Sequence, residues 1–452
     1  MRRRLAVTER ATVETPPSTL ARQFNTLPLS RFALHYPPTP DVIPLALLHP
    51  IFAEFVEDVQ LHNPTRADNE LARGLSDAMS KNYPLEADRC HKFRDLLIDH
   101  YRIHLYAAGV GGTTRTTDGD AMVGQFMVIV CEGKEGNRGG CPDVQGCLYW
   151  VEAIRKMVEV NDPLNVLPCI VISLFGACLL LTLYPCLFFI GPTIGFYGTV
   201  LTDRVQLEPL TDHFTLNLNH HEDFSRVARA FGALRIAFNK LCEYYQNLPT
   251  PRSPERVMFP YPDGWTANGD VELTYHSRVD KNRLIFLATT TNGAKVLVKF
   301  TRRYSEEVHQ YCARAGVAPE LLGFLPLPAG WYMVIMEYLD PETYRTLEPS
   351  DGSNNDLVAG IRQVVKTLHG GGFVHGDIRH VNILTRRSLE DAQNVFLIDF
   401  DWAGLEGKTR YPPNINLTSV VRPEGVEDGE LIQQAHDWFM VEHIFCANKI
   451  WF

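Results

Sequence analysis

One short segment near the C-terminus, residues 375–382, constrains this chain more than any other. It holds Asp377 and Asn382, five positions apart. A β-prone apolar run, residues 395–398, then ends at Asp399. Carboxylate and amide oxygens are the ligands that hard divalent cations such as Mg²⁺ prefer. The order predicts an acidic site at the end of a buried strand, with Asn382 and Asp399 as its metal ligands.

Phosphoryl transfer needs such a site, together with a cation on the phosphates and a carboxylate that orients the accepting hydroxyl. Lys299 interrupts an apolar strand at residues 296–300, where a kinase-type fold places the amine that holds the α- and β-phosphates of ATP. Asp377 would orient the hydroxyl. Arg379, two positions later, would face the γ-phosphate.

A helix is expected over residues 304–315, because its apolar positions recur at helical spacing. Glu306 and Glu307 lie near its start, and one of them is expected to pair with Lys299. Glu307 is the preferred partner, because apolar residues follow it at the phase expected of the pairing helix. In the structural alternative, both glutamates only stabilise the helix N-terminus.

The nucleotide base is expected to bind along a buried strand at residues 331–339. By chain order, the end of this strand would supply backbone hydrogen bonds to adenine, at Met336, Glu337 and Leu339. A helix at residues 358–368 then leads toward the segment that contains Asp377.

The ordered set resembles the eukaryotic protein kinase superfamily, and more closely the fungal-type and crinkler-effector kinase-like group. This resemblance implies a two-lobed α+β fold, ATP and Mg²⁺ as cofactors, and transfer to serine or threonine of an unidentified protein. It also implies that Pro423-Glu424 closes the activation segment and that Asp437 buttresses the loop of Asp377. The motifs that carry it are His375-Gly376-Asp377, Asp399-Phe400-Asp401-Trp402-Ala403-Gly404, Arg410-Tyr411-Pro412 and Arg422-Pro423-Glu424-Gly425.

Three departures from the kinase pattern have consequences. Gly376 replaces the arginine of His-Arg-Asp, so control by a phosphorylated activation segment is not expected. Asp401 replaces the glycine of Asp-Phe-Gly, and either adds a metal ligand or stiffens the turn. Residues 271–291 contain no G-x-G-x-x-G. A pseudokinase without turnover is therefore an alternative, although the retained Lys299 and Asp377 favour catalysis.

The N-terminal half contains a second constellation. Asp118 precedes a strand predicted at residues 125–131, which leads into Glu132-Gly133-Lys134, and Gln145 opens the next helix. Two carboxylates could bind Mg²⁺ while the lysine steadies a phosphate. The spacing resembles the PD-(D/E)xK nuclease superfamily, with Thr117 in place of its proline, and implies a nucleic-acid partner and a restriction-endonuclease-like α/β domain. In the alternative, Glu132 and Lys134 belong to a solvated loop.

Residues 167–201 contain no charged side chain. About 20 apolar residues suffice to span a bilayer, but glycines and prolines divide the segment into short pieces. Two or three buried strands, or an insertion foreign to the fold, are the alternatives. Membrane association is not favoured.

The domain organisation expected is an irregular arm at 1–40, an α/β domain at 41–249 and a kinase-like domain at 250–452. A proline-rich linker at 247–254 marks the boundary. Helical spacing also predicts helices within 67–106, at 143–159 and at 224–245. A net charge of −10 argues against coating nucleic acid by bulk electrostatics. Ten cysteines without a Cys-x-x-Cys pair indicate reduced thiols in an intracellular protein. With the crinkler-effector resemblance, this implies a protein of the cytoplasm or nucleus, or one delivered into a host cell.

Overall fold

The computed structural model describes residues 42–445 apart from 82, 111–112, 135–140, 161–164, 177, 182–186, 191, 203, 219, 249–255, 267–269 and 389–394. The chain divides into two compact units, Met1–Pro262 and Asp263–Phe452, which we call the N-terminal and C-terminal units. The arm expected at 1–40 lies outside the described residues, as does most of the expected linker.

Residues 256–262 belong to the N-terminal unit because hydrogen bonds hold them there. The Tyr261 N–H donates to the Leu47 carbonyl at 2.7 Å. The Arg256 guanidinium donates to the carbonyls of Pro260 and Tyr261 at 2.5 and 2.8 Å. The division at Pro262 therefore falls after the boundary that the linker predicts.

A six-stranded sheet forms the centre of the N-terminal unit. Its strands are β1 (Gly119–Val123), β2 (Phe126–Lys134), β3 (Cys169–Phe175), β6 (Thr193–Leu201), β7 (Val205–Pro209) and β8 (Phe214–Thr215). They run in the order β1-β2-β3-β6-β7, with β8 paired to β6. Only the β2–β3 pair in this sheet is parallel, and a parallel pair needs a long crossover, here a helix.

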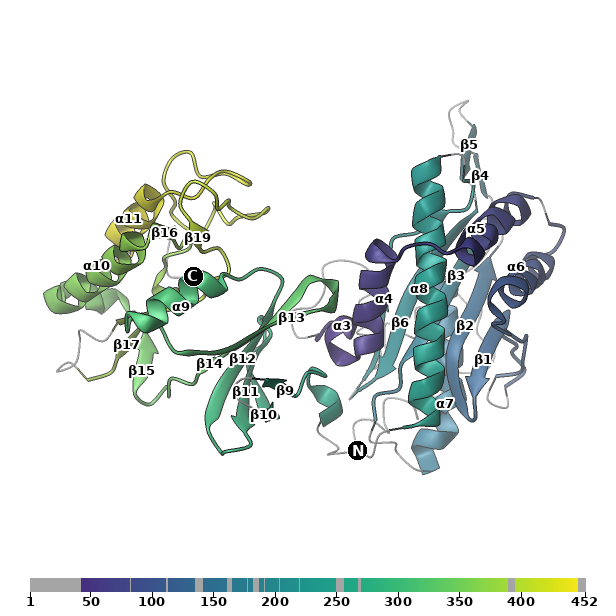
Figure 1. The fold of residues 1–452 in the computed structure, drawn as a ribbon, viewed down its shortest axis with the longest axis horizontal. Coiled ribbons are helices and arrows are strands. Elements are labelled where there is room, and N and C mark those ends of the chain that lie inside the picture. The colour runs from purple at the N-terminus through teal and green to yellow at the C-terminus, as the bar shows by residue number, and fades with distance from the viewer. Residues whose placement is uncertain are drawn as a thin grey trace. The chain divides into compact units, whose positions relative to one another are not determined.

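Helices cover both faces of this sheet (Figure 1). Phe196 of β6 packs against Phe55 and Phe231 on one face, while Gly146 packs against Val171 of β3 on the other. The first face belongs to α4 and α8 and the second to the crossover helix α7, because side chains alternate along a strand. The helices are α3 (Leu45–Leu48), α4 (Pro50–Leu61), α5 (Arg66–Met79), α6 (Glu86–Tyr101), α7 (Pro142–Val160) and α8 (His221–Gln246). α5 to α8 lie where the periodicity predicts helices, whereas α3 and α4 were not predicted.

Within the charge-free segment 167–201, most of the residues that the structure describes form strands. β3 and β6 lie in the middle of the central sheet, and most of their residues are buried. β4 (Cys178–Leu181) and β5 (Leu187–Ile190) pair as a separate antiparallel hairpin. In the part of the chain that the structure describes, no helix has both the length and the apolar character needed to cross a bilayer. The prediction of buried strands is confirmed for β3 and β6.

The C-terminal unit begins with a second six-stranded sheet, antiparallel throughout. Its strands are β9 (Gly264–Thr266), β10 (Asp270–Asp280), β11 (Ile285–Thr290), β12 (Lys295–Thr301), β13 (Leu321–Leu327) and β14 (Trp331–Glu337). The order β13-β14-β12-β11-β10-β9 places β12 inside the sheet. Lys299 therefore lies on an inner strand, as predicted.

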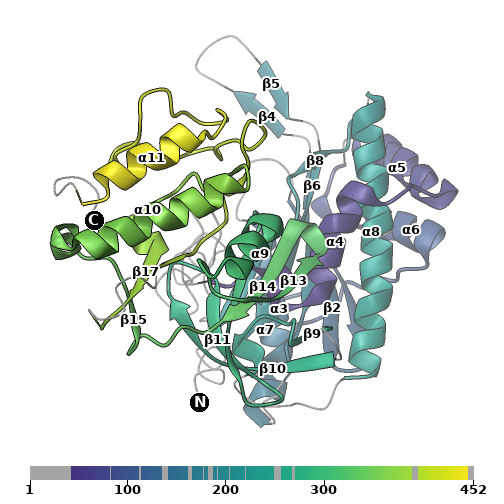
Figure 2. The ribbon, with the colours of Figure 1, turned by 60° about the vertical axis from the view of Figure 1, so that its left-hand side comes forward.

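Helices and short strands form the rest of the C-terminal unit, and α10 and α11 lie side by side (Figures 1 and 2). The helices are α9 (Glu306–Arg314), α10 (Asn355–Gly370) and α11 (Gln434–His443), with 3₁₀ turns η2 (Pro328–Gly330), η3 (Pro349–Ser353) and η4 (His380–Asn382). The short strands are β15 (Tyr344–Thr346), β16 (Phe373–Val374), β17 (Ile383–Arg386), β18 (Val395–Leu397) and β19 (Gly404–Leu405).

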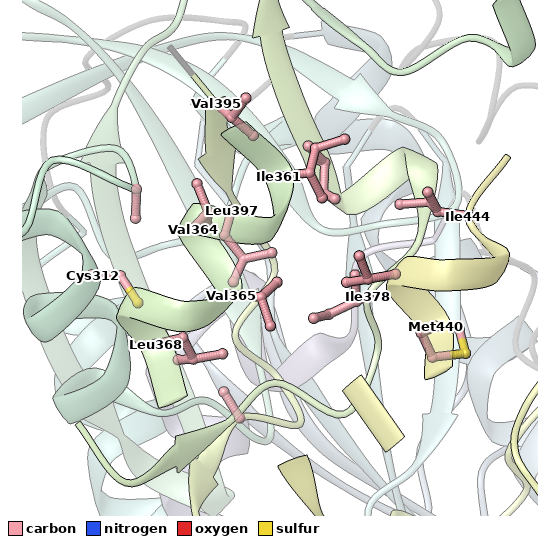
Figure 3. Close-up of a cluster of buried hydrophobic side chains, with 14 of the residues drawn as sticks. Cys312, Ile361, Val364, Val365, Leu368, Ile378, Val395, Leu397, Met440 and Ile444 are labelled. Atoms are coloured by element: carbon pink, nitrogen blue, oxygen red, sulfur yellow. The ribbon is translucent and has the colours of Figure 1, made fainter. Parts of the chain in front are cut away.

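A buried apolar cluster joins these elements (Figure 3). Val365 and Leu368 of α10, Met440 of α11 and Ile378 all belong to this one cluster. Burial of each such side chain contributes about 1.5–3 kcal/mol. Because Ile378 lies between Asp377 and Arg379, the core anchors the segment that carries the predicted chemistry.

Candidate active site

The loop at residues 375–382 is held by Asp437 in the first turn of α11. The buried carboxylate of Asp437 accepts the N–H groups of His375 and Gly376, each at 2.8 Å. Hydrogen bonds to a charged acceptor are roughly twice as strong as neutral ones. Asp437 therefore has the buttressing position that the kinase resemblance implied.

The backbone explains why glycine replaces arginine at position 376. Gly376 has a φ of +78°, in the left-handed region that glycine adopts without steric cost. A Cβ atom there would lie 2.7 Å from Cδ1 of Ile432. An arginine at this position would be strained and would also displace Ile432.

Asp377 is buried and held by three donors. Arg379 donates to its Oδ2 at 2.6 Å, and Arg422 donates to its Oδ1 at 2.7 Å. The Asn382 amide donates to Oδ2 at 3.0 Å. Arg422 also lies over the ring of Trp402, with 4.9 Å between Cζ and the ring centroid. Asp377 is thus pre-oriented, and the structure brings Asp377, Arg379 and Asn382 together as predicted.

Asn382 presents an oxygen suited to a metal. Its Oδ1 is buried and has no hydrogen-bond partner among the residues that the structure describes. An unpaired buried acceptor costs about 1–3 kcal/mol, and a hard cation would satisfy it. The described residues contain no group of three His, Cys, Asp or Glu side chains arranged around a metal position. The oxygens of Asn382 and Asp399 fit Mg²⁺ provided that phosphate and water complete its shell.

The Lys299 amine lies between two carboxylates of the turn after β18. It donates to Oδ1 of Asp399 at 2.5 Å and to Oδ1 of Asp401 at 2.6 Å. Glu306 and Glu307 are exposed at the start of α9, and within the described chain neither pairs with Lys299. The prediction of Glu307 as the lysine's partner is therefore wrong.

The register of α9 explains this outcome. The helix buries Val308, His309 and Cys312, which turns its two glutamates toward solvent. The His309 ring stacks on Phe400 at a centroid distance of 4.7 Å and an angle of 16°. Burial lowers the pKa of His309 to about 4, so the ring that packs on Phe400 is neutral near pH 7.

Arg283, in the turn between β10 and β11, adds a second cation at Asp399. Its guanidinium donates to Oδ2 of Asp399 at 2.7 Å. Burial disfavours the charged form of Asp399, but Lys299 and Arg283 overcome this effect and lower its pKa well below the usual range. Burial, with the neighbouring Asp399 carboxylate, raises the pKa of Asp401 despite the contact to Lys299.

These side chains line a cleft of about 420 Å³. A smaller, mostly apolar cavity of about 110 Å³ shares Arg283, Lys299 and Asp399 with it. The cleft is lined by Asn282, Arg283, Leu284, Lys299, Phe300, Thr301, Arg302, Trp331, Asp377, Arg379, Asp399, Asp401 and Trp402. The smaller cavity includes the predicted base-binding residues Met336, Glu337 and Leu339, together with Ile285, Leu297, Leu384 and Ile398.

The second constellation also comes together, in the N-terminal unit. The Asp118 N–H donates to Oε1 of Glu132 at 3.2 Å, and the Gly133 N–H donates to Oδ2 of Asp118 at 2.8 Å. Gln145 of α7 donates to Oε2 of Glu132 at 2.8 Å. Lys134 donates to Oε1 of Glu86 on α6 at 3.0 Å. All four predicted residues meet at the end of β2, and Glu86 joins them.

Burial dominates the electrostatics of this cluster. It raises the pKa of Glu132 to about 9, with a further contribution from the Asp118 carboxylate. The pKa of Asp118 is raised for the same main reason. Two carboxylates forced together in a poorly solvated site disfavour ionisation, and a bound cation would relieve that cost.

Sequence reasoning missed the roles of Arg283, Arg422 and Asp401. Arg283 lies within residues 271–291, where the basic turn Lys281-Asn282-Arg283 is the available signal. Arg422 belongs to the motif Arg422-Pro423-Glu424-Gly425, and nothing local indicates that its guanidinium reaches Asp377.

No protein-family model matches this chain, and no curated protein matches it in sequence. Three solved kinase structures are similar to part of it. The Cydia pomonella granulovirus kinase PK-1 has 18% identity and a TM-score of 0.32, over 39% of this chain and 69% of that chain. Vaccinia related kinase 3 has 16% identity and a TM-score of 0.28, over 39% of this chain and 63% of that chain. The BubR1 kinase domain has 13% identity and a TM-score of 0.31, over 42% of this chain and 65% of that chain. The matches thus cover about two thirds of each kinase. Because the TM-scores are low, we base the function on the residues that line the cleft.

Proposed function

We propose that the C-terminal unit is a divergent protein-kinase-like phosphotransferase of the fungal type that its motifs resemble. It would transfer the γ-phosphate of ATP, with Mg²⁺ bound, to a serine or threonine hydroxyl of a protein. The observation that carries this proposal is the convergence of the Lys299 amine with the carboxylates of Asp377 and Asp399 on one cleft. Phosphoryl transfer depends on positioning and electrostatic stabilisation, and this set supplies both.

Each residue has a task in this proposal. Lys299 would hold the α- and β-phosphates, while Asp399 and the unpaired Oδ1 of Asn382 would hold Mg²⁺, which neutralises phosphate charge. Arg379 would turn from Asp377 to the γ-phosphate. That movement frees Oδ2 of Asp377, which now accepts from Arg379 at 2.6 Å, to accept the hydroxyl proton.

Replacement of Asp377 by asparagine tests the proposal, because it keeps the shape of the side chain and removes the base. In the full chain with Mg²⁺ and ATP labelled in its γ-phosphate, we expect Asp377→Asn to lower transfer to a generic protein acceptor by about 10²–10⁴-fold. Asp356→Asn, on the exposed first turn of α10, is the matched control and should retain activity. Equal activity of wild type and Asp377→Asn, with both folded, would contradict the assignment.

We also infer a second candidate function, metal-dependent cleavage of nucleic acid by the N-terminal unit. Its support is the convergence of Asp118, Glu132, Lys134 and Gln145, which lie before, within and after β2, around the buried carboxylate of Glu132 and the half-buried one of Asp118. The two carboxylates would bind Mg²⁺, and Lys134 would contact the attacked phosphate.

A plasmid-nicking assay of the full chain with Mg²⁺ tests this second function. Lys134→Ala should abolish nicking, whereas Lys81→Ala, an exposed residue near the end of α5, should not. Nicking that survives Lys134→Ala, or a wild-type chain that never nicks, would exclude the nuclease assignment.

A further inference from the structure

We propose that Asp401 positions Lys299 in this chain, the task that a helix glutamate performs in protein kinases. The inference rests on the proposed phosphotransferase function. In protein kinases the strand lysine must be held by a glutamate from the neighbouring helix before the phosphates are gripped correctly. Here the holding carboxylate comes from the metal-binding turn itself.

The contacts of Asp401 suit this task. Oδ1 of Asp401 accepts from the Lys299 amine at 2.6 Å, and Oδ2 accepts from the Thr301 hydroxyl at 3.4 Å. Lys299 and Thr301 are two positions apart on β12, so they share one face of the strand. The side chain of Lys299 is 8% exposed and that of Asp401 is 28% exposed. Both carboxylate oxygens of Asp401 therefore bind side chains on one face of β12. The site is partly shielded from solvent, so its ion pair is screened less than one on the surface.

Asp401 is itself held by its neighbour Phe400, which is fully buried. The Phe400 ring stacks on His309, and the Phe400 carbonyl accepts the Ser305 N–H at 3.1 Å. These contacts tie the turn to the start of α9. His309 is the side chain of α9 that packs on the turn, while Glu306 and Glu307 are exposed, so the helix supports the turn instead of supplying the carboxylate.

The two acidic residues of the turn, Asp399 and Asp401, would have different tasks. In the described chain, Lys299 forms ion pairs with Asp399 and Asp401 and with no other carboxylate. If Asp399 held Mg²⁺, Asp401 would remain to hold the Lys299 amine. The grip on the phosphates thereby depends on the same turn as the metal, and it does not require α9 to move inward.

The competing role for Asp401 is that of a further Mg²⁺ ligand, and kinetics separate the two. In the full chain, the Michaelis constant for ATP would be measured at saturating Mg²⁺, and the half-saturating Mg²⁺ concentration at saturating ATP. We expect Asp401→Asn to raise the Michaelis constant by about tenfold, the effect of losing one partner of a partly buried ion pair, and to leave the Mg²⁺ dependence unchanged. Asp401→Glu should restore part of the loss.

Two further variants complete the experiment. Thr301→Val removes the second contact of Asp401 without changing charge and should raise the constant in the same direction by less. Glu307→Gln is the matched control and should behave as wild type. A shifted Mg²⁺ dependence in Asp401→Asn, an unchanged constant in that variant, or a comparable loss in Glu307→Gln would each refute the role of Asp401 alone. A wild-type chain that neither binds ATP with Mg²⁺ nor transfers phosphate would refute the phosphotransferase function and this inference with it.

Discussion

Single residues that depart from the kinase pattern have local structural reasons. Gly376 allows a left-handed backbone next to Ile432, and Asp401 supplies the carboxylate that α9 does not. Arg283 occupies the hairpin turn in which no glycine loop exists and contacts Asp399 directly. The departures therefore change which residues hold the side chains of the cleft in place, while charged groups of both signs still line it.

Replacement of Gly376 by alanine tests the first of these reasons. Gly407 also has a positive φ, but a Cβ atom there would meet nothing within 4 Å. We expect Gly407→Ala to cost about 1–2 kcal/mol of unfolding free energy from backbone strain. Gly376→Ala should cost more, because it adds the clash with Ile432. Urea unfolding of both variants measures the difference, and equal costs would show that the clash is relieved freely.

Glu132 should make the N-terminal unit sensitive to pH. Its pKa in the folded chain is raised to about 9 from 4.5, so the folded state binds a proton that the unfolded state has released. Stability should therefore fall as pH rises from about 4.5 toward about 9, and level off above. Mg²⁺ should oppose this loss most strongly at high pH.

Thermal melting between pH 5 and 9 measures the effect. Glu132→Gln should flatten the pH dependence and remove the response to Mg²⁺, while Asp77→Asn, at an exposed position of α5, should change neither. A wild-type profile in Glu132→Gln would exclude Glu132 as the titrating group.

At the scale of elements, three helices of the N-terminal unit are joined by one buried carboxylate. Asp68 closes the capping box of α5 with Thr65. It also accepts from the Tyr101 hydroxyl of α6 at 2.6 Å and pairs with Arg235 of α8 at 3.5 Å. Burial would raise the pKa of Asp68, but hydrogen bonds from His62, Tyr101 and Thr65 lower it to about 2.

Two substitutions should distinguish the role of Asp68 in capping α5 from its role in joining α5, α6 and α8. Thr65→Ala loses the helix cap and one hydroxyl donor to Asp68, and should cost about 1–2 kcal/mol. Asp68→Ala leaves the partners of a buried charge unsatisfied and should cost about 3–5 kcal/mol. The contribution of Asp68 is complete above its usual pKa of 3.8 and should be lost as pH falls toward about 2. Denaturant unfolding at pH 7 and pH 3 checks both values, and similar losses in the two variants would contradict the junction.

At the scale of the whole molecule, the chain holds two compact units that each enclose a core and a candidate site. Separate cores favour separate unfolding transitions. A ligand that binds only the folded form of one unit stabilises that unit, by about 2.7 kcal/mol at a hundred times its dissociation constant.

Calorimetry of the full chain should therefore show two transitions. ATP with Mg²⁺ should raise the midpoint temperature of one transition. Asp399→Asn should remove that response and leave the midpoint of the other transition unchanged. Mg²⁺ without nucleotide should raise the transition that Glu132→Gln alters. A single transition that moves as one with either ligand would contradict independent units.

The sequence by itself determined the helices α5 to α10, the strand that carries Lys299, and the residue types that gather at both candidate sites. These features are encoded locally, in the period of apolar residues and in the spacing of polar residues at strand ends. Which charges meet was decided by the tertiary structure. Lys299 pairs with Asp401 and not with Glu307, because the packing of His309 on Phe400 sets the rotation of α9.

The same holds for the features that no local pattern could place. The apolar composition of residues 167–201 suits both a membrane span and buried core strands. Only the pairing of β3 with β6 in one sheet distinguishes the two structures. Arg422 reaches Asp377 across 45 residues of chain. Long-range contacts of this kind depend on how whole elements pack, and so only the tertiary structure decides them.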